Sequence, residues 1–214
     1  MLDDYKAVIF DLDGTLIDSM WIWEEIDIKF LEKRKIKFKD DLQSDIEGMS
    51  FTETAIFFKE KFKLNDSIEK IKKEWNDLAY EYYKNEIPLK KGVRTYLQKL
   101  KLKDIKIGIG TSNSRLLAEL IINQKNIKDY FEVLITSCDV NKGKPSPDVF
   151  LKVSKDLNVA PKECLVFEDT LAGIKAAKAA GMDVIGVFDE LSKENKDIIQ
   201  GISKKYIYSF NELI

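Results

Sequence analysis

The sequence contains no histidine, and this absence removes more chemistry than any other feature of its composition. Serine–histidine–aspartate and cysteine–histidine catalysis, histidine general bases and the usual zinc sites are all excluded. Any chemistry performed by this chain must therefore use carboxylates, lysines, hydroxyl groups, backbone amides and a metal ion that prefers oxygen ligands.

Cysteine is almost absent as well. The two residues present, Cys138 and Cys164, are too few for a metal cluster or a disulfide framework, so we expect a reducing, cytoplasmic location. No segment approaches the roughly 18 consecutive apolar residues of a membrane span. The opening MLDDYK also lacks the basic and apolar regions of a signal peptide. We therefore expect no membrane partner.

A large excess of charge of one sign is missing too. Thirty-five basic residues (35 Lys and Arg) nearly balance 37 acidic ones, for a formal net charge of −2. A nucleic-acid-binding domain usually carries a basic face, so we expect no nucleic-acid partner. What is present is typical of a folded globular protein: 214 residues, of which 44% are hydrophobic and 34% charged. This length allows one large core and a smaller second domain, and we expect the chain to be a monomer.

Short apolar segments alternate with helical patterns over most of the chain. Five segments have the composition of buried strands: 7–10, 105–109, 133–136, 165–167 and 184–187. Helical spacing of apolar residues appears around 93–100, 117–121, 150–157 and 170–180. Ser146 and Pro147 are suited to the N-cap and first turn of the third helix, and Gly181 to the end of the fourth. This alternation predicts an α/β fold with a doubly wound parallel sheet.

Residues 18–88 interrupt that alternation. They contain no convincing strand and three helical patterns, which begin near Met20, Phe51 and Ile68. A capping box from Ser50 to Glu53 precedes the second. We predict a helical domain at 18–88, inserted into a core formed by residues 1–17 and 89–214. An insertion directly after the first strand would lie over the carboxyl ends of the strands, where open α/β sheets bind ligands.

The first predicted strand ends in VIFDLDGTL, which places Asp11 and Asp13 two residues apart. Alternate side chains of an extended chain share a face, so the two carboxylates should lie close together. Close carboxylates repel and raise the pKa of one of them unless a cation lies between them. The pattern therefore predicts a cation at this point.

Three more polar clusters follow predicted strands, at 110–114 (GTSNS), 141–147 (NKGKPSP) and 167–170 (FEDT). Taken singly, each has a structural explanation, because Ser, Thr, Asn and Asp are good helix N-caps. Taken together, they converge, because parallel strands end at the same edge of a sheet. The residues that could meet there are Asp11, Asp13, Thr111, Lys144, Glu168 and Asp169. Their excess of carboxylate favours Mg²⁺, while a lysine and a hydroxyl would suit a phosphate group.

These motifs together resemble the haloacid dehalogenase superfamily, in the branch with a helical cap after the first strand. The DxDGT signature lies at residues 11–15, the Ser/Thr motif at Thr111, the lysine before proline at Lys144, and the acidic motif at Glu168 and Asp169. The resemblance covers essentially the whole chain and extends to β-phosphoglucomutase-like sugar-phosphate phosphatases. It implies a Rossmann-like core, Mg²⁺ as cofactor and a small phosphorylated metabolite as substrate.

The resemblance also implies roles for the two aspartates. Asp11 would attack phosphorus and form an aspartyl phosphate, and Asp13 would protonate the leaving alkoxide and then activate water. This is the chemistry of a phosphoric monoester hydrolase rather than of a dehalogenase, because dehalogenation leaves no alkoxide to protonate.

Further residues would bind the substrate and the metal ion according to the same resemblance. The phosphate would be held by Thr111, Ser112 and Lys144. The metal would be held by Asp11, Asp169 and the backbone carbonyl of Asp13. Glu168 would either bind the metal directly or contact one of its ligands. Independently of the resemblance, their positions in this sequence make Trp21, Trp23, Asn113 and Arg115 candidate contacts to the rest of the substrate. Trp23 lies on an apolar helical stripe and is equally compatible with a core position, while Arg115 could face substrate or solvent.

Two positions separate a phosphatase from a mutase. The mutases that the chain resembles carry a histidine ten residues after the second aspartate, where this sequence has Trp23. They also carry an arginine after a Gly-x-Ser stretch, where this sequence has Phe51. A mutase must bind a doubly phosphorylated intermediate, so the missing charge favours phosphate monoester hydrolysis and leaves a β-phosphoglucomutase as the alternative.

Two functions of other classes stay open from the sequence. A receiver-like regulatory domain also groups acids, Mg²⁺, a hydroxyl and a lysine around a phosphorylated aspartate, but it has no need of the acid at Asp13. A catalytically silent interaction protein is disfavoured because every acid of the motifs is present.

Overall fold

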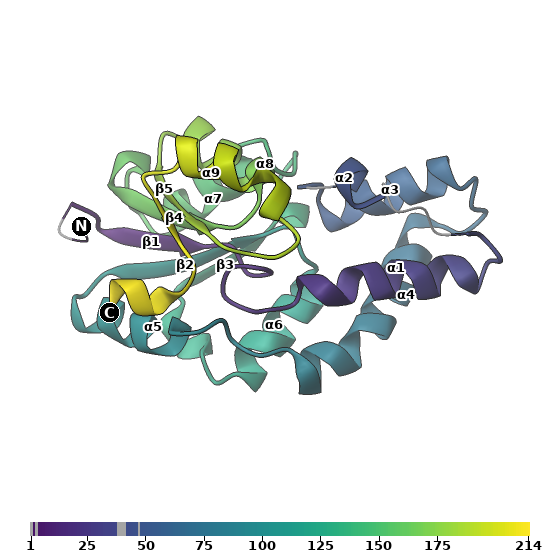
Figure 1. Ribbon diagram of the computed structural model, residues 1–214, viewed down its shortest axis with the longest axis horizontal. Coiled ribbons are helices and arrows are strands. Elements are labelled where there is room, and N and C mark those ends of the chain that lie inside the picture. Colours follow the sequence, from purple (N-terminus) through teal and green to yellow (C-terminus); the bar gives the residue numbers. More distant parts are fainter. Residues whose placement is uncertain (1, 3, 38–41, 47) are drawn as a thin grey trace.

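Six strands form one parallel sheet, in the order β3-β2-β1-β4-β5-β6 (Figure 1). The strands are β1 (Ala7–Phe10), β2 (Lys106–Thr111), β3 (Val133–Thr136), β4 (Cys164–Glu168), β5 (Asp183–Val187) and β6 (Lys205–Ile207). Because β1 lies between β2 and β4, the strand order reverses beside it, and ligands bind at such points in open α/β sheets. The sheet confirms the predicted α/β, doubly wound class.

The computed structural model describes residues 2, 4–37, 42–46 and 48–214. Two residues of the MLDDYK stretch, Met1 and Asp3, lie outside the described residues. So do residues 38–41 and 47 of the predicted helical domain.

Helices cover both faces of the sheet. Helices α5 (Val93–Leu102) and α6 (Arg115–Gln124) lie on one face, and α7 (Asp148–Asp156), α8 (Leu171–Ala179) and α9 (Lys196–Ile202) on the other (Figure 1). The central strand serves both layers, because Val8 and Phe10 join the first apolar core while Ala7 and Ile9 join the second. This double burial explains why β1 is apolar throughout and holds the residues that follow it in a fixed place.

The described residues between β1 and α5 form helices and no strand. They comprise α1 (Met20–Glu32), α2 (Leu42–Ile46), α3 (Phe51–Lys61), α4 (Ile68–Glu81) and a π-helical turn (Tyr82–Glu86). We call residues 18–88, which carry these helices, the insertion. The predicted capping box is present: the Ser50 hydroxyl accepts from the Glu53 amide, and the Glu53 carboxylate accepts from the Ser50 amide. Phe30, Phe58 and Trp75 pack together at its centre, with ring centroids 4.9–6.0 Å apart.

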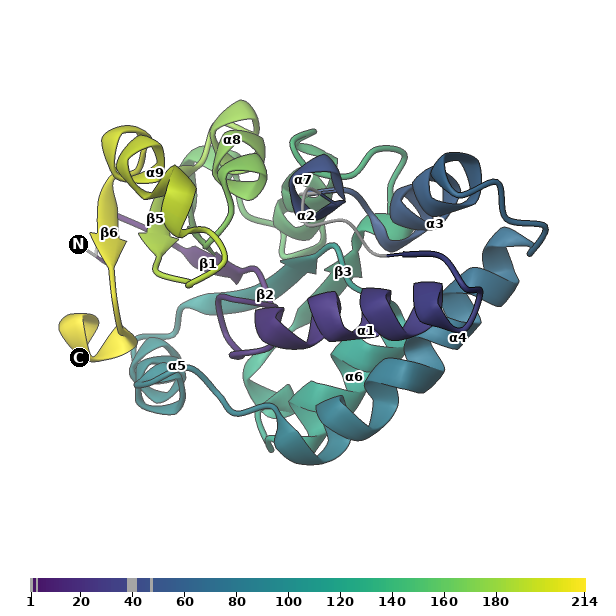
Figure 2. The same ribbon diagram turned by 45° about the vertical axis from the view of Figure 1, so that its right-hand side comes forward.

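The chain enters and leaves the insertion through two adjacent segments. Ile17 and Leu89 form an antiparallel bridge, the Asp18 amide donates to the Pro88 carbonyl (3.0 Å), and the Lys90 amide donates to the Leu16 carbonyl (2.9 Å). Figure 2 shows α1 and α4 running side by side at the end of the sheet where these crossings lie. Both crossings therefore lie close to the carboxyl end of β1, which Asp11 follows.

Several local expectations need correction. Helix α7 begins at Asp148 with Pro147 at its N-cap, and the Ser146 hydroxyl bonds the Asp148 carboxylate (2.7 Å), so the predicted N-cap at Ser146 is wrong. Strand β6 and helices α2 and α9 were not predicted, because runs of three to seven residues carry too little periodicity. Gly181 does follow α8 with a positive φ of 74°, as expected for the residue that ends a helix.

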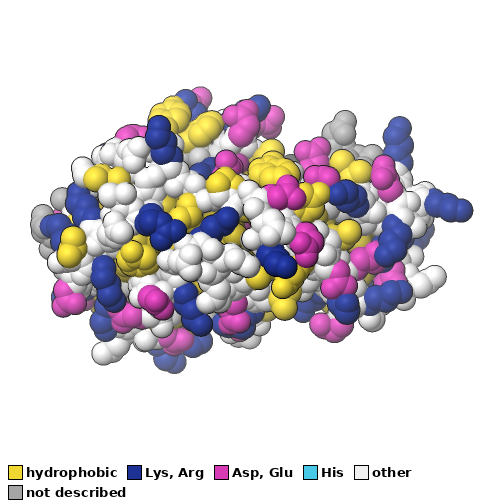
Figure 3. Space-filling model, turned by 90° about the horizontal axis from the view of Figure 1, so that it is seen from below, with side chains coloured by type: hydrophobic (Ala, Val, Ile, Leu, Met, Phe, Trp, Pro, Cys, Tyr) yellow, Lys and Arg dark blue, Asp and Glu magenta, His cyan; other side chains and the backbone are white. Residues whose placement is uncertain are grey.

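The surface and the helices add two observations. On the face shown in Figure 3, basic and acidic side chains are interspersed, with apolar side chains scattered between them. Within the described ranges, no helix combines the length and the apolar composition that crossing a membrane requires.

Candidate active site

The structure gathers the predicted polar residues at the carboxyl ends of three neighbouring strands. Asp11 follows β1, Thr111 ends β2 and Glu168 ends β4, with Asp169 directly after it. Lys144 reaches the same place from the loop before α7. The strand order explains this convergence, because β2 and β4 flank β1 on either side.

Lys144 lies between two carboxylates. Its Nζ is 2.5 Å from Asp11 Oδ1 and 2.6 Å from Glu168 Oε1, and all three side chains are more than nine-tenths buried. Burial opposes the charge of Lys144, but the two carboxylates outweigh it and raise the pKa of this lysine. Burial raises the pKa of Asp11 to about 8, although the Lys144 ammonium opposes it. One positive charge faces two buried acids, so the group remains short of positive charge.

Asp169 has a carboxylate oxygen with no partner. The Thr15 hydroxyl donates to its Oδ1 (2.9 Å), while Oδ2 is buried and makes no hydrogen bond with any described residue. The pKa of Asp169 is raised well above its ordinary value, chiefly by burial and then by the charges of Glu168 and Asp11. A Cβ at Gly14 would lie 2.2 Å from Oδ2, so only glycine lets the chain pass this carboxylate. An unpaired buried oxygen of this kind is costly unless a cation binds it.

The donors beside this oxygen fit an oxygen-preferring cation such as Mg²⁺. Among the described residues, no three acidic or cysteine side chains are grouped so that they could hold a metal ion by themselves. The predicted ligand set contains only two carboxylates, Asp11 and Asp169, and adds the backbone carbonyl of Asp13, so it remains a prediction. Glu168 is less available, because Lys144 occupies its Oε1 and the Thr170 amide and hydroxyl occupy its Oε2.

Asp13 is held in a different way, by neutral donors. The Ser19 hydroxyl (2.6 Å) and the Tyr83 hydroxyl donate to its Oδ1, and the Asn113 amide donates to its Oδ2 (2.8 Å). Burial raises the pKa of Asp13, and hydrogen bonds from these three residues and from Trp23 oppose the rise. The two aspartates of the opening motif therefore lie in distinct environments, one beside a cation and one beside hydroxyl and amide groups.

Sequence reasoning missed Ser19 and Tyr83. Ser19 occupies the N-cap of α1, yet its hydroxyl makes no capping bond and turns to Asp13 instead. Tyr83 lies on the π-helical turn, where the apolar stripe of α4 changes register, so that Tyr83 is buried while Tyr82 stays partly exposed. No spacing rule for an α-helix would have shown this residue.

The loop after β2 holds the predicted phosphate-binding residues. The Thr111 hydroxyl is buried and accepts a hydrogen bond from the backbone N–H of Asn113 (3.1 Å). The Ser112 carbonyl accepts from the Phe51 amide of the insertion (3.1 Å), and the Ser112 hydroxyl donates to the Gly48 carbonyl (3.4 Å). Helix α6 then begins at Arg115, so this loop lies at a helix N-terminus, which suits an anion.

The structure does not bring every candidate residue to this group. The Arg115 guanidinium is half-exposed and pairs with Asp139 (2.7 Å), away from the two aspartates. Trp21 is 46% exposed, and its indole donates to the Asp18 carbonyl (3.0 Å). Trp23, by contrast, packs edge-on against Phe51 (6.2 Å) and Tyr83 (6.1 Å), directly beside the contacts of Asp13.

The insertion closes onto the core beside these residues. The Ser114 hydroxyl donates to Asn76 Oδ1 of α4 (2.6 Å), and the Gly143 amide donates to Glu53 Oε1 of α3 (3.4 Å). A Cβ at Gly143 would lie 2.7 Å from the backbone nitrogen of Ser50 in the insertion, so this approach requires glycine. The loop that carries Lys144 is therefore in direct contact with the insertion.

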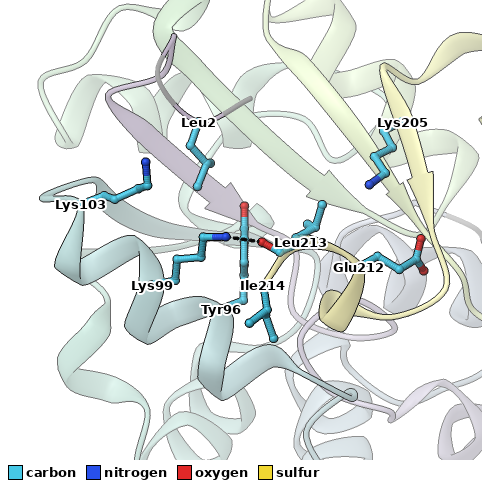
Figure 4. A pocket seen from close by; sticks show the side chains of 8 residues that line it. All are labelled: Leu2, Tyr96, Lys99, Lys103, Lys205, Glu212, Leu213 and Ile214. Carbon is cyan, nitrogen blue, oxygen red and sulfur yellow. Dashed lines mark hydrogen bonds between the residues drawn. The ribbon is translucent and has the colours of Figure 1, made fainter.

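A separate hollow of about 300 Å³ lies at the amino ends of the strands (Figure 4). Its lining includes Leu2, Tyr96, Lys99, Lys103 and Lys205, and the Lys99 ammonium donates to the Leu213 carbonyl (2.7 Å). None of the grouped acids borders it, so this hollow is distinct from the candidate active site.

A family model described as haloacid dehalogenase-like hydrolase matches residues 8–187, most of the chain. The chain belongs to this family. A phosphorylated carbohydrates phosphatase from Thermotoga maritima is 32% identical over 188 residues, which cover 87% of this chain and 87% of that protein. A beta-phosphoglucomutase from Bacillus subtilis is 32% identical over 193 residues, covering 85% of this chain and 83% of that protein.

A solved structure gives the same assignment. A beta-phosphoglucomutase from Clostridium difficile matches with a TM-score of 0.82 and 25% identity, and the match covers 98% of this chain and 93% of that one. The predicted family, its α/β fold and its likeness to both phosphatases and β-phosphoglucomutases are confirmed. So is the prediction of an enzyme of this hydrolase family, and the phosphatase names agree with a phosphoric monoester hydrolase.

Proposed function

We propose that this hydrolase is a Mg²⁺-dependent phosphatase that cleaves a small phosphate monoester through an aspartyl phosphate on Asp11. One observation carries the proposal: Asp11 lies beside the Lys144 ammonium, whereas Asp13 is held by neutral donors. Two carboxylates with such different hydrogen-bond partners are suited to different roles in one reaction. This arrangement supports Asp11 as the nucleophile and Asp13 as the acid and base.

The reaction then has two balanced steps. In the first, an Asp11 oxygen forms a bond to phosphorus while the ester P–O bond breaks, and the leaving oxygen takes a proton from Asp13. In the second, Asp13 takes a proton from water as that water attacks phosphorus, the Asp11–phosphorus bond breaks, and inorganic phosphate leaves. Both residues return to their starting states, so the net reaction is the hydrolysis of one ester bond.

Binding and charge neutralisation would come from the surrounding residues. Lys144 and the hydroxyl and amide groups of Thr111 and Ser112 would hold the phosphate oxygens. Asp11, Asp169 and the Asp13 carbonyl would hold Mg²⁺, which would supply positive charge next to the phosphate. Phosphoryl transfer depends mainly on positioning and on charge neutralisation, and this set of residues provides both.

The proposal extends to the organisation of the chain. We assign residues 1–17 and 89–214 to a catalytic core domain and 18–88 to a helical cap domain, because the two crossings lie together at 17 and 89. We further propose that the enzyme acts as a monomer in the cytoplasm; the low cysteine content favours a reducing compartment.

A sugar phosphate is the proposed substrate class, on the basis of the relatives named above. A β-phosphoglucomutase is the second candidate, since another relative carries that name. Hydrolysis is preferred because Phe51 and Trp23, both packed in apolar contacts, replace the charged groups that a mutase would use for a second phosphate.

Turnover of p-nitrophenyl phosphate tests the reaction class. We expect Mg²⁺-dependent release of p-nitrophenol, abolished by EDTA and reduced by roughly a thousandfold or more in Asp11→Asn. Equal rates in the wild type and the variant would refute the proposal. Stoichiometric phosphorylation of the protein without turnover would instead indicate a phospho-aspartate regulatory domain. The absence of any reaction would indicate an interaction protein.

A substrate panel then separates the two enzymatic candidates. Sugar and nucleotide monophosphates are compared for release of inorganic phosphate, and glucose 1-phosphate is also assayed for conversion to glucose 6-phosphate. Phosphate release without isomerisation supports the phosphatase, and the reverse supports the mutase.

A further inference from the structure

Tyr83 belongs to the insertion but reaches the core. It lies on the π-helical turn Tyr82–Glu86, where the Ile87 amide donates to the Tyr82 carbonyl five residues earlier (3.1 Å). Such widened turns are rare and often occur at functional sites. Here the turn rotates Tyr83 inward, so that its side chain is fully buried.

The Tyr83 hydroxyl completes a closed set of hydrogen bonds. It donates to Asp13 Oδ1 and accepts from Asn113 Nδ2 (2.6 Å), and the same Asn113 amide donates to Asp13 Oδ2 (2.8 Å). The three residues come from different parts of the chain: the end of β1, the end of the insertion and the loop after β2. Each group thus fixes the other two.

The ring of Tyr83 is also fixed. It packs edge-on against Trp23, with centroids 6.1 Å apart and planes at 63°. A buried ring held by an aromatic neighbour has little freedom to turn, so the position of its hydroxyl is set before any substrate binds.

We propose that Tyr83 is a positioning residue, whose hydroxyl holds the Asp13 carboxyl in the orientation needed to protonate the leaving group. The inference rests on the proposed phosphatase function and names a further residue on which its first step depends. A hydroxyl can donate or accept, so Tyr83 can remain bonded to Asp13 before and after that carboxyl gives up its proton.

The origin of the donors adds a consequence for the insertion. Ser19 and Tyr83 both lie on the insertion side of the crossings at residues 17 and 89, and only Asn113 belongs to the core loop. A displacement of the insertion would withdraw two of these three donors from Asp13. The orientation of the acid therefore depends on the insertion being seated as it is in this structure.

Two neighbouring tyrosines provide a matched test. Tyr83→Phe removes only the buried hydroxyl and keeps the ring. Tyr82→Phe removes a hydroxyl that bonds Lys29 (2.7 Å) and Glu25 (2.7 Å), two exposed or half-exposed side chains, and not Asp13. Each variant loses one hydroxyl with two hydrogen bonds, so the pair isolates the location of the loss.

The readout is the dependence of kcat/KM on the leaving group. Phenyl phosphate has a more basic leaving oxygen than p-nitrophenyl phosphate and needs more help from an acid, and kcat/KM reports the step in which that oxygen departs. We expect Tyr83→Phe to lower kcat/KM for phenyl phosphate about tenfold more than for p-nitrophenyl phosphate. Tyr82→Phe should leave the ratio of the two values unchanged.

The other outcomes are equally informative. Equal losses on both esters in Tyr83→Phe, or no loss on either, would overturn the positioning role. If Tyr83→Phe does not fold, Asn113→Ala removes the amide that supports the same hydroxyl, and an unchanged ratio there would also overturn it. Failure of the wild-type enzyme to hydrolyse either ester would refute the phosphatase proposal itself, which is a distinct result.

Discussion

The two aspartates of the opening motif lie a few ångströms apart along the chain, yet the groups around them are built on different principles. Asp11, Lys144 and Glu168 form a charged group supplied entirely by the core. Asp13 is instead surrounded by three uncharged donors. Ser19 and Tyr83 belong to the insertion and Asn113 to the core. The first group is held together by ion pairs, and the second by hydrogen bonds from uncharged side chains. This division fits a reaction in which one carboxylate must attack and the other must move a proton.

Removing the Lys144 ammonium should disrupt the charged group and cause the largest loss of stability and activity. In Lys144→Met, two buried carboxylates would face each other without their shared partner, which we expect to cost about 3–5 kcal/mol of unfolding free energy and nearly all activity. Urea denaturation and p-nitrophenyl phosphate turnover measure the two losses. Lys142→Met, on an exposed lysine of the same loop, is the control and should change neither. A Lys144→Met protein of wild-type stability would show that the charged group is not coupled in this way.

The pH dependence of stability should sharpen the same comparison. Burial raises the pKa of Asp11 to about 8, and it raises that of Asp169 well above its ordinary value. Between the unfolded value near about 4 and these folded values, the folded protein binds more protons than the unfolded chain. The free energy of unfolding should therefore fall as pH rises, by about 1–3 kcal/mol between about pH 5.5 and about pH 8 without Mg²⁺.

Thermal denaturation across this pH range, in EDTA and in Mg²⁺, checks that expectation. Mg²⁺ should flatten the dependence, because a cation bound by Asp11 and Asp169 removes the advantage of the protonated forms. In EDTA, the stability of Asp169→Asn should depend less on pH than that of the wild type, and Mg²⁺ should stabilise this variant little. An identical slope in both proteins would contradict the assignment of the effect to this group.

The smallest loss of stability is expected from disrupting a second group of charges, which lies within the insertion. Arg34 donates to Glu74 (2.6 Å) and Asp66 (3.1 Å). Burial would raise the pKa of Glu74, but the hydrogen bonds and charges of Arg34 and Lys33 outweigh it and lower that pKa. Stabilisation by Glu74 is thus present above its unfolded value near about 4.3 and is lost as pH falls through its lower folded value.

Arg34→Met should therefore cost about 1 kcal/mol near neutral pH, less in acid, and no activity. Urea denaturation at about pH 7 and about pH 3, with a turnover assay at neutral pH, tests this. A loss of activity comparable to that of Lys144→Met would erase the distinction between buried and peripheral charge.

The sequence predicted the charged group better than the neutral one, for a physical reason. Asp11, Lys144, Glu168 and Asp169 each follow a predicted strand or precede a predicted helix, and the topology of a parallel sheet brings such positions together. Tyr83 depends instead on a change of helical register, which α-helical periodicity cannot represent. Ser19 lies at the N-cap of α1, where serine is a common residue, so nothing in the sequence marks its bond to Asp13.

The fold shows the same contrast between regular and irregular features. The five predicted strands and the main helices are present because burial on both faces of a sheet leaves a strong apolar pattern. Strand β6, of three residues, was missed because so short a run has no recognisable alternation. Arg115 was considered for the substrate, but its ion pair with Asp139 directs it elsewhere, and no local pattern indicates such a partner.

The closeness of the two crossings, where Ile17 pairs with Leu89, bears on how such an enzyme can diversify. Because the insertion begins and ends at one point, evolution can lengthen, shorten or exchange it without disturbing the order of the strands. Every such exchange, however, also replaces the residues that stand where Ser19 and Tyr83 stand here. Under the proposed mechanism, an exchanged insertion would therefore have to supply new hydrogen-bond donors for Asp13 as well as new contacts to the substrate.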